Sequence, residues 1–208
     1  MNPNESVPLS HRLAWVVLAL VVSGIVAAAV WKRTTAVPEP ASIGVVGDFS
    51  LKNQRGETKT FKDFEGTPWV VGFVFTRCGG TCPQIVQSMT RLRDRLKEFP
   101  GMQMVCFSMD PEHDTPEVMA RYAKQQNAEH PNWHFLTGSY AEIVRITRGD
   151  FKLGIEEGVS PEEPILHSPK LVFLDERGVI RGYYEAITTE GMDEMFKALS
   201  GHYSRAKK

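Results

Sequence analysis

Two cysteines with three residues between them, Cys78 and Cys82, are the part of this sequence best suited to chemistry. The 208-residue chain has only three cysteines. A structural disulfide at this spacing would close a very short loop. It would therefore reduce the entropy of the unfolded chain, and so stabilise the fold, only a little. Redox-active thiol pairs more often have two intervening residues. Two thiolates also form a soft donor set suited to Cu(I), provided that a third ligand converges on them.

The surrounding residues predict where the two thiols lie. The apolar run 69–75 is bounded by turn residues and predicts a strand buried on both faces. Apolar residues recur at helical spacing from Pro83 onward, so a helix should follow the loop. Cys78 should lie in the loop and Cys82 at the helix start, where free N–H groups and the helix dipole favour thiolates. Arg77 adds a positive charge, so we expect a thiol pair with lowered pKa values at the sheet edge where α/β proteins bind ligands.

A candidate third ligand, His167, lies immediately before a strand predicted to begin near Lys170. It follows segment 154–164, whose glycines and glutamates predict a surface loop. A histidine in such a place is more often a polar loop residue than a ligand. If folding brings it to the thiol loop, however, it completes a set of two cysteines and one histidine.

The remaining elements indicate an α/β sandwich around a mixed sheet, because strands alternate with helices before a final hairpin and helix. The net charge of −1 does not suggest a nucleic-acid-binding surface. The predicted elements are a hairpin over 48–61, strands over 69–75, 102–109 and 133–136, helices from 83, from Asp114 or Thr115, and over 139–146, a hairpin over 170–186 and a helix over 190–199.

Residues 13–31 form an uncharged apolar run of 19 residues. As a helix this run would span roughly 30 Å, about the thickness of the hydrocarbon core of a membrane. Trp15 and Trp31 lie near its ends, where aromatic rings favour the interface. We therefore predict a transmembrane anchor. The alternative is a cleaved signal peptide, whose apolar region is usually shorter, at about 7–15 residues.

We infer the orientation of this anchor from the redox chemistry expected of the cysteines rather than from the charges that flank the apolar run. Arg12 precedes the run while Lys32 and Arg33 follow it, which weakly favours a cytoplasmic C-terminal side. Exchangeable disulfides belong outside the cytoplasm, and we give that argument precedence. The expected organisation is an N-terminal tail over 1–12, the anchor over 13–31, a linker over 32–42, a globular domain over 43–202 and a basic tail over 203–208.

Three separated motifs, in this order, resemble those of the Sco/SenC family: FVFTRCGGTCP, SMDPEHDTPE and LHSPKLVFLDERG. The resemblance covers nearly all of residues 43–201. It implies a thioredoxin-like, three-layer sandwich after a single-pass anchor in the inner (cytoplasmic) membrane, with the domain on the periplasmic side. It also implies one copper ion, as Cu(I) or Cu(II), bound by Cys78, Cys82 and His167, with Asp110 near the site.

The implied function is assembly of the dinuclear copper centre of cytochrome c oxidase. The protein would deliver copper to the copper domain of subunit II, reduce the cysteines of that domain, or do both, and an upstream copper chaperone or thiol reductant would serve it. The alternative is a thiol–disulfide oxidoreductase that cycles a Cys78–Cys82 disulfide and has no copper role.

The thiol loop departs from the family pattern at two positions. Gly79 stands where family members commonly have proline, and Gly80 stands where an aspartate-like residue is usual. The change makes the loop more flexible and removes a negative charge, so the family's reduction potential and copper affinity do not carry over. The glycines should also let the loop curl so that both sulfurs face one point.

Three further residues are expected to lie outside this chemistry. Cys106 lies within an apolar strand and predicts a buried, inert thiol. His130 and His134 flank the short segment 131–133 and predict a surface loop.

Overall fold

The computed structural model describes residues 9–34, 42–95, 101–160, 163–167 and 169–206, and it gives side-chain environments for 14–27, 42–95, 101–154 and 169–205. The chain divides into two compact units, residues 1–40 and 41–208.

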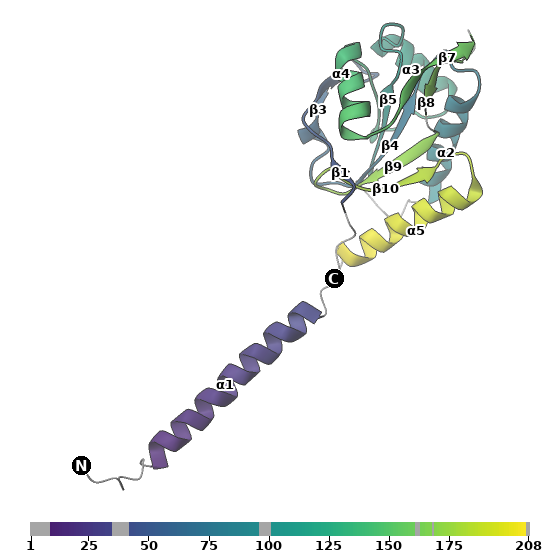
Figure 1. The fold of residues 1–208 in the computed structure, drawn as a ribbon. Helices are drawn as coiled ribbons and strands as arrows, with labels where there is room; N and C mark the ends of the chain where they lie inside the picture. Colours follow the sequence, from purple (N-terminus) through teal and green to yellow (C-terminus); the bar gives the residue numbers. More distant parts are fainter. Residues whose placement is uncertain (1–8, 35–41, 96–100, 161–162, 168, 207–208) are drawn as a thin grey trace. The chain divides into compact units, whose positions relative to one another are not determined.

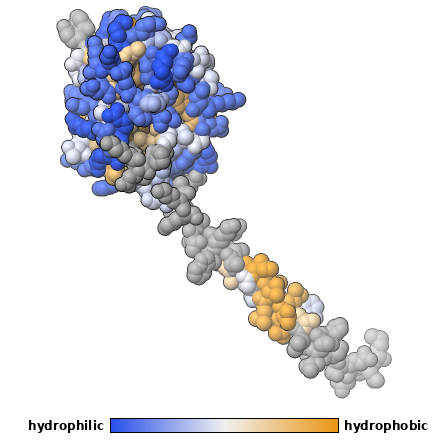
Figure 2. All heavy atoms as spheres, turned by 180° about the vertical axis from the view of Figure 1, so that it is seen from behind, coloured by the Kyte–Doolittle hydropathy of each residue, from blue (hydrophilic) through white to orange (hydrophobic). Residues whose placement is uncertain are grey.

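The first unit contains helix α1 (Leu9–Thr34), which includes the apolar run (Figure 1). Large apolar side chains such as Trp15, Leu20 and Ile25 are exposed along it. Figure 2 shows a mainly hydrophobic surface on the described part of this helix. Within the described residues, no helix combines the length and the apolar character of a membrane span. The predicted anchor therefore stays a prediction.

The second unit is built on one mixed sheet, as predicted, with strand order β1-β10-β9-β4-β5-β6. The parallel strands β4, β5 and β6 lie together, while β9 runs antiparallel to β4 and β10 antiparallel to β9. The strands are β1 (Gly44–Val45), β4 (Trp69–Val74), β5 (Gln103–Ser108), β6 (Trp133–Leu136), β9 (Lys170–Leu174) and β10 (Val179–Glu185).

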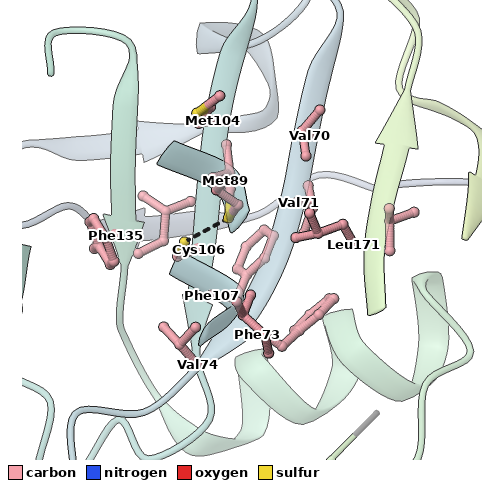
Figure 3. Packing of buried hydrophobic residues seen from close by; sticks show 14 of the residues in the cluster. Val70, Val71, Phe73, Val74, Met89, Met104, Cys106, Phe107, Phe135 and Leu171 are labelled. Carbon is pink, nitrogen blue, oxygen red and sulfur yellow. Dashed lines mark hydrogen bonds between the residues drawn. The ribbon is translucent and has the colours of Figure 1, made fainter. Parts of the chain in front are cut away.

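One face of the sheet is covered by helices α2 (Thr81–Arg95), α3 (Pro116–Gln125) and α5 (Thr189–Ala206). Cys106 of β5 contacts Met89 of α2, as Figure 3 shows. Tyr122 of α3 packs edge-on against Phe135 of β6. These contacts, with that between α2 and α5, form one helical layer.

The opposite face carries the hairpin of β2 (Ser50–Lys52) and β3 (Thr58–Thr60), the short turn η1 (Phe61–Asp63), and α4 (Tyr140–Val144), which continues as the π-helical turn η2 (Arg145–Asp150). Aromatic residues from these segments pack on the sheet. Phe64 stacks on Trp69, and Phe151 packs against Phe73. The domain therefore has the three predicted layers (Figure 1).

Several predicted elements differ from the structure. The predicted loop over 154–164 was wrong, because β7 (Ile155–Ser160) and β8 (Glu163–His167) form an antiparallel pair over most of it. Two strands that pair with each other satisfy their own backbone hydrogen bonds, so glycine and charged residues are compatible with strands there. Thr115, not Asp114, caps α3. Helix α5 continues to Ala206, past the end expected for the domain.

Candidate thiol and metal site

The thiol loop is positioned by close packing between β4 and α2. A Cβ atom on Gly72 of β4 would lie 3.1 Å from Sδ of Met89 and 3.3 Å from Cγ2 of Ile85, both on α2. Glycine at this position lets the helix approach the strand closely. The short connection of residues 75–80 then brings the chain from the end of the strand to the start of the helix at Thr81.

The two cysteines lie where the sequence predicts. Cys78 is in the loop and Cys82 is the second residue of α2; both are buried, and no disulfide joins them. The amide of Cys78 donates to the carbonyl of Phe75 at 3.2 Å. The amide of Cys82 donates to Sγ of Cys78 at 3.4 Å, so the start of the helix faces the first sulfur.

The two thiols differ in their electrostatics. Donation from the Cys82 thiol, together with the amides of Cys82, Gly80 and Thr81, lowers the pKa of Cys78 to about 5, although burial opposes this. The interaction with Cys78, followed by burial, raises the pKa of Cys82. The prediction of two lowered pKa values was thus right for Cys78 and wrong for Cys82. A shared proton explains this, because one sulfur can be the acceptor only while the other is the donor.

The thiol loop contains the glycine pair Gly79 and Gly80. Neither Gly79 nor Gly80 has a positive φ, so the turn does not depend on the left-handed conformation. A Cβ atom on Gly79 would meet nothing within 4 Å. The backbone at Gly79 therefore has room for a side chain.

Arg77 and Asp110, both predicted to lie near the site, form an ion pair beside it. Nε and Nη2 of Arg77 donate to Oδ2 of Asp110 at 2.8 Å and 2.6 Å. The arginine was expected to offset negative charge on the sulfurs. Its guanidinium instead joins the loop after β4 to the loop after β5.

Asp114 is a site-adjacent residue that the sequence analysis considered only as a helix cap. Its carboxyl group is fully buried and accepts hydrogen bonds from Thr76 Oγ1 at 2.5 Å and from Ser108 Oγ at 2.6 Å. The signal available in the sequence was its spacing, four residues after Asp110. That spacing alone did not indicate a partner 38 residues away.

His167 is the last residue of β8, where its Cα pairs with that of Ile155. Its side chain lies outside the described part of the structure, so the predicted convergence with Cys78 and Cys82 stays a prediction. Among the residues whose side chains are described, no group of three or more His, Cys, Asp or Glu residues is arranged to hold a metal ion.

Of the three residues expected to lie outside the chemistry, Cys106 and His130 lie as predicted, whereas His134 lies in the predicted strand over 133–136 and not in a surface loop. Cys106 is buried, and burial raises its pKa to about 12. His130 is exposed, but His134 is buried in β6. Arg55 Nη2 donates to Nδ1 of His134 at 3.1 Å, so this buried ring nitrogen has a hydrogen-bond partner.

The sequence matches the SCO1/SenC family over residues 38–202. It is 29% identical over 152 residues to a SCO1 protein homolog of Bacillus subtilis (strain 168), covering 72% of this chain and 78% of that protein. It is 31% identical over 159 residues to the mitochondrial SCO2 homolog of Bos taurus, covering 74% of this chain and 58% of the longer relative.

Solved structures share the fold. A SCO1/SenC family lipoprotein from Bacillus anthracis matches with a TM-score of 0.71 at 26% identity, over 79% of this chain and 98% of that one. BsSco, described as a member of the Sco family of cytochrome c oxidase assembly proteins with a disulfide switch, matches with a TM-score of 0.69 at 27% identity, over 79% and 95% of the chains.

A third structure, Arabidopsis thaliana ScoI with copper bound, matches with a TM-score of 0.66 at 24% identity, over 77% of this chain and 99% of that one, and shows the same fold. These likenesses agree with the mixed sheet and the flanking layers. The chain belongs to the SCO1/SenC family and has its thioredoxin-like fold.

Proposed function

We propose that this chain is a membrane-anchored copper-binding protein that assists assembly of the dinuclear copper centre of cytochrome c oxidase. The observation that carries the proposal is the pair of buried cysteines that no disulfide joins, Cys78 in the loop before α2 and Cys82 at the helix start, with Cys78 favoured as a thiolate. Family membership and the copper-bound and oxidase-assembly relatives support it.

The donor set fits copper as a cargo. Two sulfur donors suit a soft cation such as Cu(I). Cys78 is already a thiolate at neutral pH, whereas Cys82 must lose its proton on binding, so uptake should release a proton. His167 is the proposed third ligand of one copper ion per domain. The copper domain of oxidase subunit II is the proposed recipient, and an upstream copper chaperone or thiol reductant the proposed supplier.

The unequal thiols also favour a second role, as a reductant of disulfides. The Cys78 thiolate would attack a target disulfide, forming a mixed disulfide and releasing one target thiolate. Cys82 would then lose its proton and attack Sγ of Cys78, which releases the second target thiolate. The target gains two electrons, and the protein keeps a Cys78–Cys82 disulfide. This role needs both cysteines but does not need His167.

The exposed apolar side chains of α1 support a membrane anchor over residues 13–31, with the domain on the periplasmic side. An alkaline phosphatase fusion at the C-terminus should be active, and the full chain should stay in the membrane fraction after carbonate extraction. An inactive fusion would contradict the orientation. Release by carbonate would contradict the anchor.

Copper binding is tested by titrating the reduced full chain in detergent with Cu(I) against a competing chelator. We expect one equivalent to bind, with affinity reduced roughly 100-fold or more in Cys78→Ala, Cys82→Ala and His167→Ala. Cys106→Ala is the matched thiol control and should bind like the parent, because Cys106 is buried elsewhere in the core.

The histidine control is His130→Ala, which removes an exposed imidazole. If His167→Ala binds Cu(I) as tightly as His130→Ala and the parent, the copper-site assignment is wrong. Reduction of a disulfide-bonded subunit II copper domain by His167→Ala at the parental rate, together with weak copper binding by the parent, would favour the reductant role alone.

A further inference from the structure

Asp114 is a buried carboxyl group whose described partners are neutral donors. Oδ1 accepts from the hydroxyl of Thr76 at 2.5 Å and Oδ2 from the hydroxyl of Ser108 at 2.6 Å. The backbone amide of Thr76 lies 3.3 Å from both carboxyl oxygens. Burial raises the pKa of Asp114, although the hydrogen bonds from Ser108 and Thr76 oppose this.

These bonds join the ends of the two central parallel strands. Ser108 is the last residue of β5, and Thr76 follows β4 and lies two residues before Cys78. The same network continues into the second loop, where the amide of Asp110 donates to Ser108 Oγ at 3.1 Å and the amide of Asp114 donates to the carbonyl of Asp110 at 2.9 Å. The thiol loop is therefore held from inside the domain by Asp114.

A buried carboxyl group with neutral partners is a costly way to join two strand ends. Burying a polar or ionisable group costs free energy that hydrogen bonds only partly return. What the carboxyl adds is directional, because two hydroxyls and an amide must all point at it. It fixes Thr76 through the backbone as well as the side chain, and so fixes where the chain enters the thiol loop.

We propose that Asp114 is a positioning residue for the thiol site, which holds Thr76 so that the amides of residues 80–82 reach the sulfur of Cys78. The inference rests on the proposed redox and metal-binding role of the thiol pair. If the loop is released, the reduced form loses part of its stabilising amide contacts, whereas the disulfide form does not. The equilibrium between them should then move toward the disulfide.

The test is the thiol–disulfide equilibrium of the reduced full chain in glutathione buffers, for the parent and Asp114→Asn. We expect the Asn variant to favour the disulfide by about tenfold, equivalent to about 30 mV. The control is Asp175→Asn, which alters a buried carboxyl after β9, near the start of β4. Its stability should fall while its thiol equilibrium stays parental.

A second pair of variants keeps the inference testable if Asp114→Asn does not fold. Thr76→Val removes the hydroxyl donor and should favour the disulfide by roughly threefold, while Thr76→Ser keeps the donor and should behave like the parent. Parental equilibria in both Asp114→Asn and Thr76→Val would show that the network is only structural and overturn the inference. A parent that forms no reversible disulfide would overturn the proposed redox function and this inference with it.

Discussion

Asp114 and Asp175 are buried carboxyl groups near opposite ends of the central strand β4, and their surroundings differ. Asp114 bonds to Thr76, just beyond the end of β4, near the thiols. Asp175 follows Leu174, whose Cα pairs with that of Trp69 at the start of β4. The two residues therefore lie at opposite ends of β4, one beside the candidate chemistry and the other away from it.

Asp175 has full charge compensation. Arg181 donates to its Oδ2 through Nε at 3.0 Å and Nη2 at 2.6 Å, and the amides of Arg177 and Val179 donate to Oδ1, each at 2.9 Å. Burial alone would raise the pKa of Asp175, but the Val179 amide and the Arg181 guanidinium hold it below its usual range. It stabilises the turn between β9 and β10 as a paired, ionised group.

The two buried aspartates have different roles. The ion pair between Asp175 and Arg181 stabilises the turn between β9 and β10. Near the thiols, the cation Arg77 pairs with Asp110, and Asp114 accepts hydrogen bonds from neutral donors instead. The thiol site thus gives up some stability, while the Cys82 thiol, together with the amides at the helix start, lowers the pKa of Cys78. Such a division is common where a site must be reactive.

The largest expected effect on stability is at Asp175, near the end of β4 that lies away from the thiols. Asp175→Ala removes one partner of a buried ion pair with Arg181, whose side chain is 8% exposed. Loss of one partner of a buried ion pair costs about 3–5 kcal/mol, so we expect the free energy of unfolding to fall by that amount in urea titrations. A loss below about 1 kcal/mol would contradict the assigned role of this pair.

His134 makes the same region pH-dependent. Burial, followed by the charge of Arg55, lowers the pKa of His134 to about 4 from 6.5. The unfolded chain therefore binds more protons between these values, and stability present above pH 6.5 is lost as the pH falls toward 4. We expect a loss of roughly 3 kcal/mol over that interval. His134→Gln should remove this part of the slope; a parental slope in that variant would contradict the assignment.

Gly72→Ala tests how closely α2 must approach β4. The added methyl would lie 3.1 Å from Sδ of Met89 and 3.2 Å from Cδ2 of Leu171, so these side chains must shift. Overpacking of this kind costs about 1–3 kcal/mol, measured by chemical unfolding. An unchanged or higher stability would show that the strand and helix have room to spare.

Gly79→Ala is the matched glycine control in the thiol loop and should have the smallest effect. The new Cβ atom meets nothing within 4 Å, and the residue has no positive φ. We expect a change in unfolding free energy within about 0.5 kcal/mol. A loss comparable to that of Gly72→Ala would mean that the loop needs glycine after all.

The sequence predicted the fold and the position of the thiols because both depend on local patterns. The apolar strand and the periodic helix placed Cys78 and Cys82 at the helix start. The inequality of the two thiols was not predictable, since it depends on which sulfur faces the helix amides. The roles of Asp114 and His134 depend on contacts with residues distant in sequence, which a single sequence does not reveal. His167 remains a prediction.

The central claim is that Cys78 and Cys82 form an unequal pair, and the rate of thiol alkylation as a function of pH tests it most directly. The reduced full chain is treated with iodoacetamide, and each cysteine is followed by peptide mass spectrometry. We expect Cys78 to react first, with half its maximal rate near pH 5, while Cys82 and Cys106 stay protected. Faster labelling of Cys82, or a Cys78 midpoint near the unperturbed thiol value of about 8.5, would contradict the account.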